Sequence, residues 1–441
     1  MKKAFSFLIL MGLSHLVLSQ FVAMPLNYPN DGNGYMSWWV SIADAQHAWV
    51  GTVKQAPVGG YQAFPVAVKT NDGGENWIFD TIPATGNAWI QHLAAWDANT
   101  CYYLFTDGNT GGGAVWKTSD GGSTWSKKTT TQFDGGWANF IVLFSADTAL
   151  AMGDPNGGRF EIQLTNNGGN TWTRVPASDM PAAQTGEWGL SGECATAGNS
   201  VWFGTSKGRC FYSSDRGLHW SVSQVSTQYL HFCFSDPMNG FGWTAAEDVY
   251  YQTSDGGQTW TSNHNPTGSH FGYMSPVPGI VHGFVATLTQ PDTTTDVIFT
   301  NDLFLTSSFI DTNISKNSTG IFFKNSSTGW MGGSYLWYHN IFKFQGELTT
   351  VQEPARLDDG MRIIPNPAFR DAVVVLPRGT DTGERWVRIL DLTGKVVSEK
   401  RYTTAGQSIK LDASALRNGI YIAEVILENG TGLRQRWVVQ H

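Results

Sequence analysis

The sequence is poor in charged residues. Asp, Glu, Lys and Arg make up 15% of the 441 residues, which is too little for a long helical or coiled-coil protein. A disordered chain is excluded too, because 13% of the residues are aromatic. The formal net charge of −8 does not favour nucleic acid or an anionic membrane surface as a partner. What is abundant is Gly (50) together with Trp (19), Tyr (14) and Phe (25), which indicates an all-β protein.

Long apolar runs are also scarce. The one such run, residues 4–18, follows Lys2 and Lys3 and precedes a small residue, Ser19. A run of about fifteen residues is too short to span a bilayer comfortably but is typical of a signal peptide. We therefore expect residues 1–19 to be a signal peptide, with a buried N-terminal strand as the alternative. We expect the mature protein to be exported and to lack a membrane span.

Cysteines are few, and none forms a CxxC pair. Export would permit a disulfide between Cys194 and Cys210, whereas four buried free thiols, including Cys101 and Cys233, are an equal alternative. The sequence contains no GxGxxG, P-loop or HExxH motif and no zinc-ligand spacing. We therefore expect no cofactor and no metal.

An octapeptide repeat is the strongest signal in the chain. Each copy begins with Thr or Ser, has Asp or Asn in third place, continues with Gly and ends on Trp. The third and last positions of the five copies are Asp72 and Trp77, Asp120 and Trp125, Asn167 and Trp172, Asp215 and Trp220, and Asp255 and Trp260. A sixth, degenerate copy occupies residues 300–302. Such a peptide predicts a tight hairpin, in which Asp caps the backbone of the turn, Gly supplies a positive φ and Trp packs between neighbouring sheets.

The spacing of the repeat predicts the architecture. Successive tryptophans lie 48, 47, 48 and 40 residues apart, which is the length of one four-stranded propeller blade. Counting apolar strands beyond the last copy favours seven blades in a single β-propeller, with six as the alternative. We expect one terminal strand to complete the blade begun by the other, because this removes an exposed sheet edge.

The octapeptides resemble the Asp-box (BNR, bacterial neuraminidase) repeat. The resemblance implies that their Asp residues hold turns rather than perform catalysis. Residues 149–155, residues 158–160 and residues 186–188 are further similar to the single propellers of the photosystem II stability/assembly-factor-like class. That resemblance implies a propeller used as a binding platform over residues 20–350.

Composition changes after residue 350. Residues 351–441 hold 13 Lys or Arg against 11 Asp or Glu, and residues 351–360 have the composition of a linker. Residues 361–441 predict a small Ig-like β-sandwich. They resemble the type A C-terminal sorting domain of the type IX (Por) secretion system of Bacteroidetes, on motif positions Pro365, Asn366, Pro367, Asp391, Gly394, Gly419 and Tyr421. This resemblance implies the secretion machinery as a partner and a secreted or surface-attached product; an adhesion or carbohydrate-binding module is the alternative.

Aromatic residues recur near the start of the expected innermost strands. They are Trp39, Trp89, Trp137, Trp188, Tyr229 and Phe271, and we take them, with Arg159, as ligand-binding candidates. If they converge, they form a stacking surface suited to sugars or flat apolar ligands. The alternative is that they only pack the core between blades.

An enzymatic function requires charged groups that the expected propeller largely lacks. A sialidase clamps its substrate with an arginine cluster, but only four arginines are present, and Arg216 lies inside a turn. Another glycoside hydrolase would need two facing carboxylates, for which Asp107, Asp154, Glu187 and Glu193 are candidates. We therefore expect a secreted binding or scaffold propeller for an unknown glycan or protein ligand. A glycoside hydrolase is the alternative, and a surface adhesin a third possibility.

Overall fold

The computed structural model describes residues 20–31, 33–55, 63–84, 87–134, 136–244, 249–264, 270–289, 294–304, 307–314, 320–332, 340–348, 362–364, 371–376, 384–391, 395–402, 408–427 and 432–439. The predicted signal peptide and the predicted linker, residues 351–360, lie outside these residues. Contacts divide the chain into two compact units, residues 1–350 and 351–441. No helix among the described residues is both long and apolar enough to cross a membrane.

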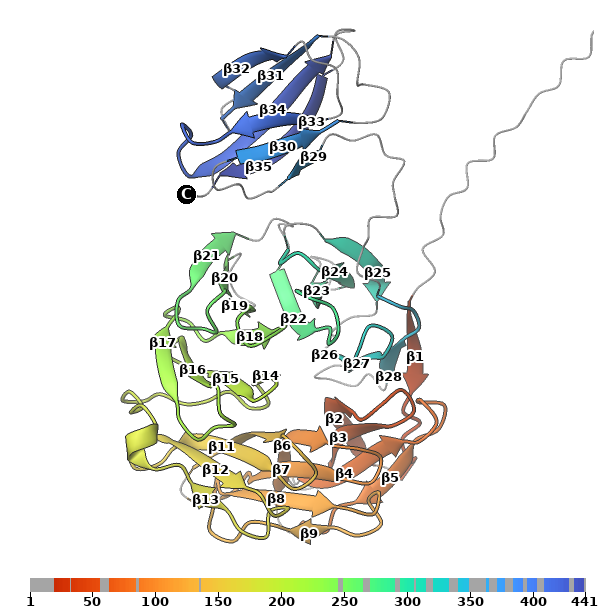
Figure 1. Ribbon diagram of the computed structural model, residues 1–441. Helices are drawn as coiled ribbons and strands as arrows, with labels where there is room; N and C mark the ends of the chain where they lie inside the picture. Colours follow the sequence, from red (N-terminus) through yellow and green to blue (C-terminus); the bar gives the residue numbers. More distant parts are fainter. Residues whose placement is uncertain are drawn as a thin grey trace, which may run out of the picture. The chain divides into compact units, whose positions relative to one another are not determined.

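The first unit is built from seven four-stranded antiparallel sheets arranged in a ring, with one strand of each sheet toward the centre (Figure 1). Blade 1 contains β2 (Gly34–Ile42), β3 (Ala48–Gln55), β4 (Ala63–Thr70) and β5 (Ile78–Thr81). Blade 2 contains β6 (Ala88–Ala95), β7 (Cys101–Asp107), β8 (Gly113–Thr118) and β9 (Ser126–Lys127). Blade 3 contains β10 (Ala138–Leu143), β11 (Ala149–Pro155), β12 (Phe160–Thr165) and β13 (Thr173–Arg174), and a short 3₁₀ turn, η1 (Ala177–Asp179), follows it.

The remaining blades repeat this order from the centre outward. Blade 4 contains β14 (Ala195–Ala197), β15 (Ser200–Gly204), β16 (Arg209–Ser213) and β17 (Ser221–Gln224). Blade 5 contains β18 (His231–Phe234), β19 (Gly240–Trp243), β20 (Val249–Thr253) and β21 (Thr261–His264). Blade 6 contains β22 (His270–Pro276), β23 (Phe284–Thr289), β24 (Thr295–Thr300) and β25 (Ser308–Ile314). Blade 7 contains β26 (Gly320–Phe323), β27 (Gly329–Gly332), β28 (Asn340–Phe344) and β1 (Phe21–Pro25).

The predicted single propeller and the preferred count of seven blades are confirmed. The N-terminal strand β1 pairs antiparallel with β28 as the outermost strand of blade 7, so the two ends of the unit close the ring. Apolar side chains form one buried cluster between each pair of neighbouring blades. The second strands, such as β15 and β19, are buried along their whole length because both of their faces meet a neighbouring blade.

The repeated octapeptides connect the third strand of a blade to its outermost strand. In blade 5 the Asp255 carboxylate accepts hydrogen bonds from the Thr259 amide (2.9 Å) and the Thr253 hydroxyl (2.8 Å). The same hydroxyl accepts a bond from the Gly257 amide at 3.0 Å. Gly256 and Gly257 have φ values of +75° and +92°, which only glycine adopts without strain. Asn167 makes the equivalent bonds in blade 3, so the amide substitutes for the carboxylate there.

The tryptophan that ends each octapeptide packs toward the preceding blade. Trp125 of blade 2 lies edge-to-face on Trp49 of blade 1, at 6.1 Å between ring centroids. Trp77 of blade 1 packs in the same way on Trp330 of blade 7, at 5.9 Å. The Trp260 indole of blade 5 donates to the Ser223 hydroxyl of blade 4 at 3.2 Å. The Trp172 indole donates to a backbone carbonyl beyond β9 of blade 2, and Trp220 joins the cluster between blades 3 and 4. These contacts tie each of blades 1 to 5 to the blade that precedes it in the ring.

The four cysteines are free thiols rather than a bridged pair. Cys101, Cys210 and Cys233 are buried in strands and Cys194 is partly buried. Burial raises the pKa of each thiol above its ordinary value, so the thiols remain protonated and pack as small apolar groups.

The second unit is a two-sheet β-sandwich, as predicted. One sheet has the order β29 (Arg362–Ile364), β30 (Asp371–Val375) and β33 (Ser408–Asp412). The other has the order β32 (Val396–Tyr402), β31 (Arg385–Leu390), β34 (Gly419–Leu427) and β35 (Gly432–Val439). Side chains from both sheets form one core around the fully buried Trp437.

Of the predicted sorting-motif residues, Pro365, Asn366, Pro367 and Gly394 lie outside the described residues. Gly419 begins β34, where the Tyr421 hydroxyl donates to the Arg417 carbonyl at 3.0 Å, and the Asp391 carboxylate accepts from the Lys395 amide at 3.1 Å.

Replacing Asp255 with Ala removes the acceptor that holds its turn. We expect the propeller to lose about 1–2 kcal/mol of unfolding free energy, as when a helix cap is removed. Asp255→Asn is the matched control, since Asn167 holds the same turn in blade 3. Burial raises the pKa of Asp255, but its hydrogen bonds outweigh burial and hold it below the ordinary 3.8. The carboxylate therefore stabilises the fold above pH 3.8, and this stabilisation is lost as the pH falls through the lowered pKa of Asp255. Urea unfolding at neutral and at acid pH measures the free energy of unfolding of each variant. Asp255→Asn should lose less of this free energy at acid pH than the wild type does.

Replacing Phe21 with Ala tests ring closure by β1. Phe21 is buried against Phe323 and Phe344 of blade 7, and its amide donates to Asp311 of blade 6 at 2.8 Å. We expect a loss of about 3–5 kcal/mol in the unfolding free energy, the usual range for a buried Phe→Ala change. Val22→Ala on the exposed face of the same strand is the control. Equal effects of the two substitutions on the unfolding midpoint would contradict the role of β1.

Candidate ligand-binding site

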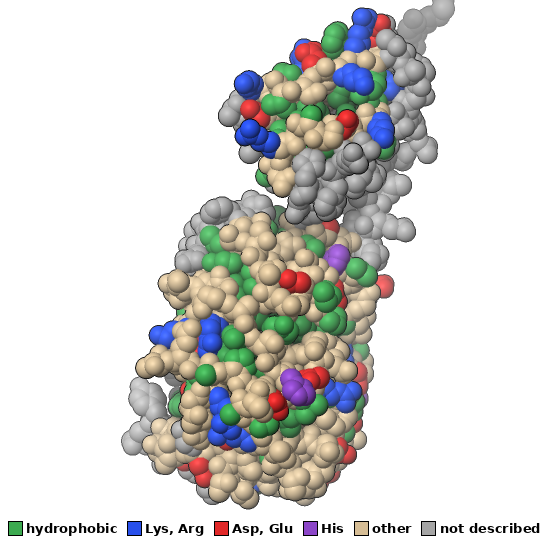
Figure 2. Space-filling model, turned by 60° about the vertical axis from the view of Figure 1, so that its left-hand side comes forward, with side chains coloured by type: hydrophobic (Ala, Val, Ile, Leu, Met, Phe, Trp, Pro, Cys, Tyr) green, Lys and Arg blue, Asp and Glu red, His purple; other side chains and the backbone are tan. Residues whose placement is uncertain are grey.

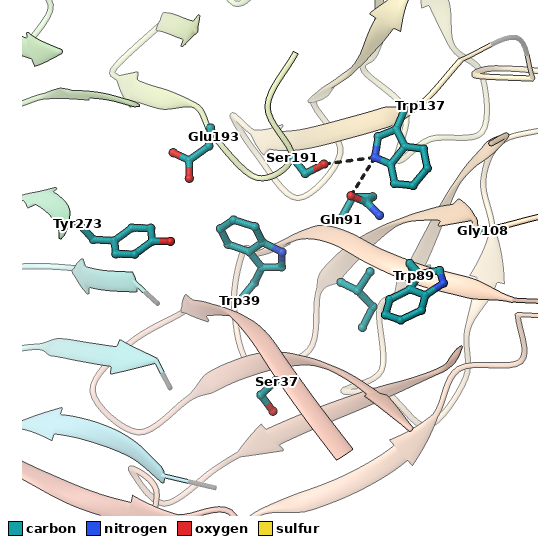
Figure 3. Close-up of a pocket in the computed structure, with 10 residues that line it drawn as sticks. Ser37, Trp39, Trp89, Gln91, Gly108, Trp137, Ser191, Glu193 and Tyr273 are labelled. Atoms are coloured by element: carbon teal, nitrogen blue, oxygen red, sulfur yellow. Dashed lines mark hydrogen bonds between the residues drawn. The ribbon is translucent and has the colours of Figure 1, made fainter. Parts of the chain in front are cut away.

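A cavity of about 540 Å³ opens near the axis of the propeller. It lies at the end where the innermost strands begin, opposite the octapeptide turns, because Trp89 is the second residue of β6 and Trp137 immediately precedes β10. Blades 1, 2, 3, 4 and 6 contribute to its wall (Figure 3). The lining residues are Ser37, Trp39, Trp89, Ile90, Gln91, Gly108, Trp137, Ser191, Glu193 and Tyr273.

Backbone irregularities in the innermost strands aim these side chains. The pairing of β2, β6, β10 and β22 shifts register between Ser37 and Trp39, between residues 90 and 92, between residues 138 and 140, and between residues 271 and 274. A bulge of this kind redirects the local side chains and is common beside binding sites. Three of these shifts fall directly at cavity-lining residues, Ser37, Gln91 and Tyr273. The cavity wall therefore depends on departures from regular strand alternation.

Trp39 occupies the middle of the cavity. Its ring lies edge-to-face on His92, at 5.6 Å between ring centroids, and in Figure 3 it stands between Tyr273 and Trp89. It also presses on the segment that precedes blade 4, since a Cβ atom at Gly192 would stand 2.2 Å from the indole. Gly192 has a φ of +71°, so both its conformation and its neighbour require glycine. An indole from blade 1 thus meets a turn from blade 4 next to the axis.

A hydrogen-bond network holds the wall formed by Trp137. The Trp137 indole donates to Gln91 Oε1 at 3.0 Å and to Ser191 Oγ at 3.2 Å, the two dashed lines in Figure 3. Behind it, Asp154 accepts from the Asn139 amide and from the Gly189 backbone, both at 2.8 Å. Burial raises the pKa of Asp154, and these two hydrogen bonds offset part of the rise. Asp154 therefore anchors the segment that precedes β14, and it is not among the cavity-lining residues.

The Glu187 carboxylate, like that of Asp154, binds groups of the protein itself. Its carboxylate forms an ion pair with Arg209 and also accepts from the Thr205 hydroxyl (2.5 Å) and the Gln184 amide (2.8 Å). Burial raises the pKa of Glu187, but the Arg209 and Thr205 contacts outweigh it, so the net pKa lies below the ordinary value. The side chain is buried and does not line the cavity.

Glu193 is the one carboxylate among the lining residues. Its Oε2 lies 2.9 Å from Nδ1 of His231, and in Figure 3 its side chain stands beside Tyr273 and Ser191. Burial raises the pKa of Tyr273 to about 12, and the Glu193 charge contributes to the rise. The cavity thus combines aromatic surface with an amide, two hydroxyls and one carboxylate.

The structure brings together four of the predicted site residues, namely Trp39, Trp89, Trp137 and Glu193. Trp188 and Tyr229 are exposed on the segments before β14 and β18, and neither is among the lining residues. Phe271 is buried between blades 5 and 6, where it contacts Tyr250 and Phe304. Arg159 lies in the β11–β12 connection, and Asp107 caps the amides of the turn that follows β7.

Tyr273, Gln91 and the two serines of the wall were not predicted. The register shift in β22 places Tyr273 at the cavity although Phe271, two residues earlier, packs the core. Regular alternation would put both side chains on the same face, so no sequence signal separates them. Within the residues that the structure describes, no cluster of His, Cys, Asp and Glu could hold a metal ion.

Residues 362–440 match the family of secretion system C-terminal sorting domains. This match indicates export by the type IX secretion system, to the cell surface or the medium. In Figure 2 the described surface of this unit shows more Lys and Arg than that of the propeller, whose viewed face is mostly uncharged.

The propeller is similar in fold to solved structures of YCF48. YCF48 bound to D1 peptide superposes with a TM-score of 0.56 at 14% identity, over 75% of this chain and 97% of that one. YCF48 from Cyanidioschyzon merolae gives a TM-score of 0.55 at 13% identity, over 74% of this chain and 99% of that one. These likenesses support the fold alone. No curated protein matches the chain.

Substituting Gly192 with Ala should disturb the cavity. The new Cβ would overlap the Trp39 indole and would also need an unfavourable φ. Gly198→Ala is the matched control, because Gly198 has a φ of +61° but open space around its Cβ position. We expect the control to lose only about 1 kcal/mol of stability. Gly192→Ala should lose more and should alter the near-UV circular dichroism of the tryptophans, and identical spectra for the two variants would contradict this packing.

Proposed function

We propose that this chain is an exported binding propeller whose axial cavity takes an uncharged glycan. The observation that carries the proposal is the composition of the wall, in which indole and phenol rings surround a few hydrogen-bonding groups and a single carboxylate. Ligand sites commonly combine an apolar wall with a small number of fixed polar groups. Indole faces suit the C–H faces of a sugar ring, while Gln91, Ser37, Ser191 and Glu193 can bond its hydroxyls.

Two features of the chain agree with an extracellular binding role. The octapeptide turns fit the Asp-box class, and residues 149–155 and 186–188 fit the stability/assembly-factor-like class. YCF48, which shares the propeller fold, holds a bound peptide in one structure. The N-terminal basic and apolar residues fit a signal peptide of an exported Bacteroidetes protein. Residues 20–350 would then form the working unit, and the sorting unit would serve its delivery.

Hydrolysis is less well supported by the geometry. A glycoside hydrolase needs two carboxyl groups about 5–10 Å apart on either side of the scissile bond. Of the predicted carboxylates, Glu193 lines the cavity, whereas Asp154 and Glu187 hold backbone and arginine partners. The arrangement therefore supports binding without turnover.

Binding is tested with the chain carrying its sorting unit and a panel of neutral hexasaccharides of glucose, xylose and mannose. We expect at least one to bind and Trp137→Ala to weaken it about tenfold or more, since a stacking contact is lost. Trp96→Ala is the matched control, because Trp96 is similarly exposed but lies in the turn after β6, at the opposite end of the blade. Calorimetry measures the affinities.

Three results would overturn the proposal. Failure of every hexasaccharide to bind would remove the glycan role and leave a protein ligand to be sought. Release of reducing ends by the wild type, abolished by Glu193→Gln, would replace binding with hydrolysis. Equal loss of affinity in Trp96→Ala and Trp137→Ala would place the ligand outside the cavity.

A further inference from the structure

A partly buried histidine lies against the carboxylate of the cavity. His231 begins β18 of blade 5, and its Nδ1 lies 2.9 Å from Oε2 of Glu193, with 14% and 21% of the two side chains exposed. The imidazole stacks on Trp243 at 5.4 Å, and the rings of Tyr229 and Tyr273 lie 5.9 Å and 6.0 Å from it. Three aromatic rings from blades 5 and 6 therefore fix the imidazole against the carboxylate.

His231 is the group that can supply a positive charge to Glu193. Tyr229, on the segment before β18, and Tyr273, on β22, are the other titratable groups that face the imidazole among the described residues. The pKa of Tyr273 is raised to about 12, so this phenol stays neutral. The charge of Glu193 also acts on His92, but burial outweighs it and lowers the pKa of His92 to about 4, so His92 is neutral near pH 7.

We propose that His231 is a positioning residue for ligand binding, which holds one oxygen of Glu193 so that the other is presented to a hydroxyl of the glycan. The proposal rests on the proposed function of the cavity. A carboxylate held at one oxygen keeps a fixed direction for its second hydrogen bond, and a fixed acceptor binds more tightly than a mobile one. Loss of the imidazolium charge would release the carboxylate.

The direction in which pH changes the glycan affinity follows from the ion pair between Glu193 and His231. Burial lowers the pKa of His231, but Glu193 outweighs burial and raises the net pKa above the ordinary 6.5. The ion pair is therefore complete below pH 6.5 and is lost as the pH rises through the raised pKa. Affinity for the glycan should fall on the alkaline side, while the fold, held by the blade contacts, persists.

The experiment measures the affinity of the tightest-binding neutral hexasaccharide between about pH 5.5 and about pH 9. We expect wild-type affinity to fall about tenfold over this range, the loss of one charge-assisted hydrogen bond. His231→Gln should bind at every pH about as weakly as the wild type does at the alkaline end. His219→Gln is the matched control, because His219 also pairs with a carboxylate, Asp215, but lies in an exposed octapeptide turn. It should reproduce the wild-type profile.

A second measurement does not depend on the ligand. The ring protons of His231 are titrated by NMR in the full chain, in the wild type and in Glu193→Gln, and the variant should show a lower pKa. Near-UV circular dichroism verifies that each variant is folded.

Parallel pH profiles for the wild type and His231→Gln, or an unchanged His231 titration in Glu193→Gln, would overturn the positioning role while binding itself persists. Absence of binding at every pH would instead overturn the proposed function, and this affinity claim with it.

Discussion

The structure depends on one repeated interaction, the self-capping of a tight turn by an Asp or Asn and a Thr or Ser. The turn places two residues at positive φ, both of them glycine except for Arg216 in blade 4, and holds a tryptophan directly before the outer strand. That tryptophan then packs against the preceding blade, as Trp125 does on Trp49 and Trp77 on Trp330. A local hydrogen-bond pattern of a few residues is thereby converted into contact between sheets, and its repetition around an axis produces the ring.

Because the octapeptide turns lie at one end of the blades, the connections at the other end, including those that join one blade to the next, are free to vary. The segment between β13 and β14 uses this freedom. Asp154 and Glu187 hold it by hydrogen bonds and an ion pair, so Gly192 meets Trp39 of blade 1 and Glu193 lines the cavity. Asp154 and Glu187, two of the candidate catalytic carboxylates, thus support the site rather than line it, and the cavity has the single carboxylate of Glu193.

The repeat made the architecture predictable from the chain alone. Side-chain chemistry at the octapeptides is local, and their spacing of 40–48 residues predicted the propeller. Counting apolar strands beyond the last copy favoured the seven blades that the structure has. The cavity was predictable only in part. Trp89 and Trp137 lie at the starts of innermost strands and Trp39 lies within β2, and all three line the cavity. Phe271, however, packs a blade interface, while Tyr273 lines the cavity in its place.

Local pattern therefore indicated which residues form turns and strands, favoured seven blades over six and predicted a C-terminal sorting unit. Only the folded chain decided which aromatic rings face the axis, that His231 of blade 5 stands behind Glu193 of the segment before blade 4, and that the cysteines remain separate. The physical reason is that these outcomes arise from register shifts in the innermost strands and from contacts between blades far apart in the chain. Neither the register shifts nor the contacts between distant blades produce a periodic pattern in the sequence.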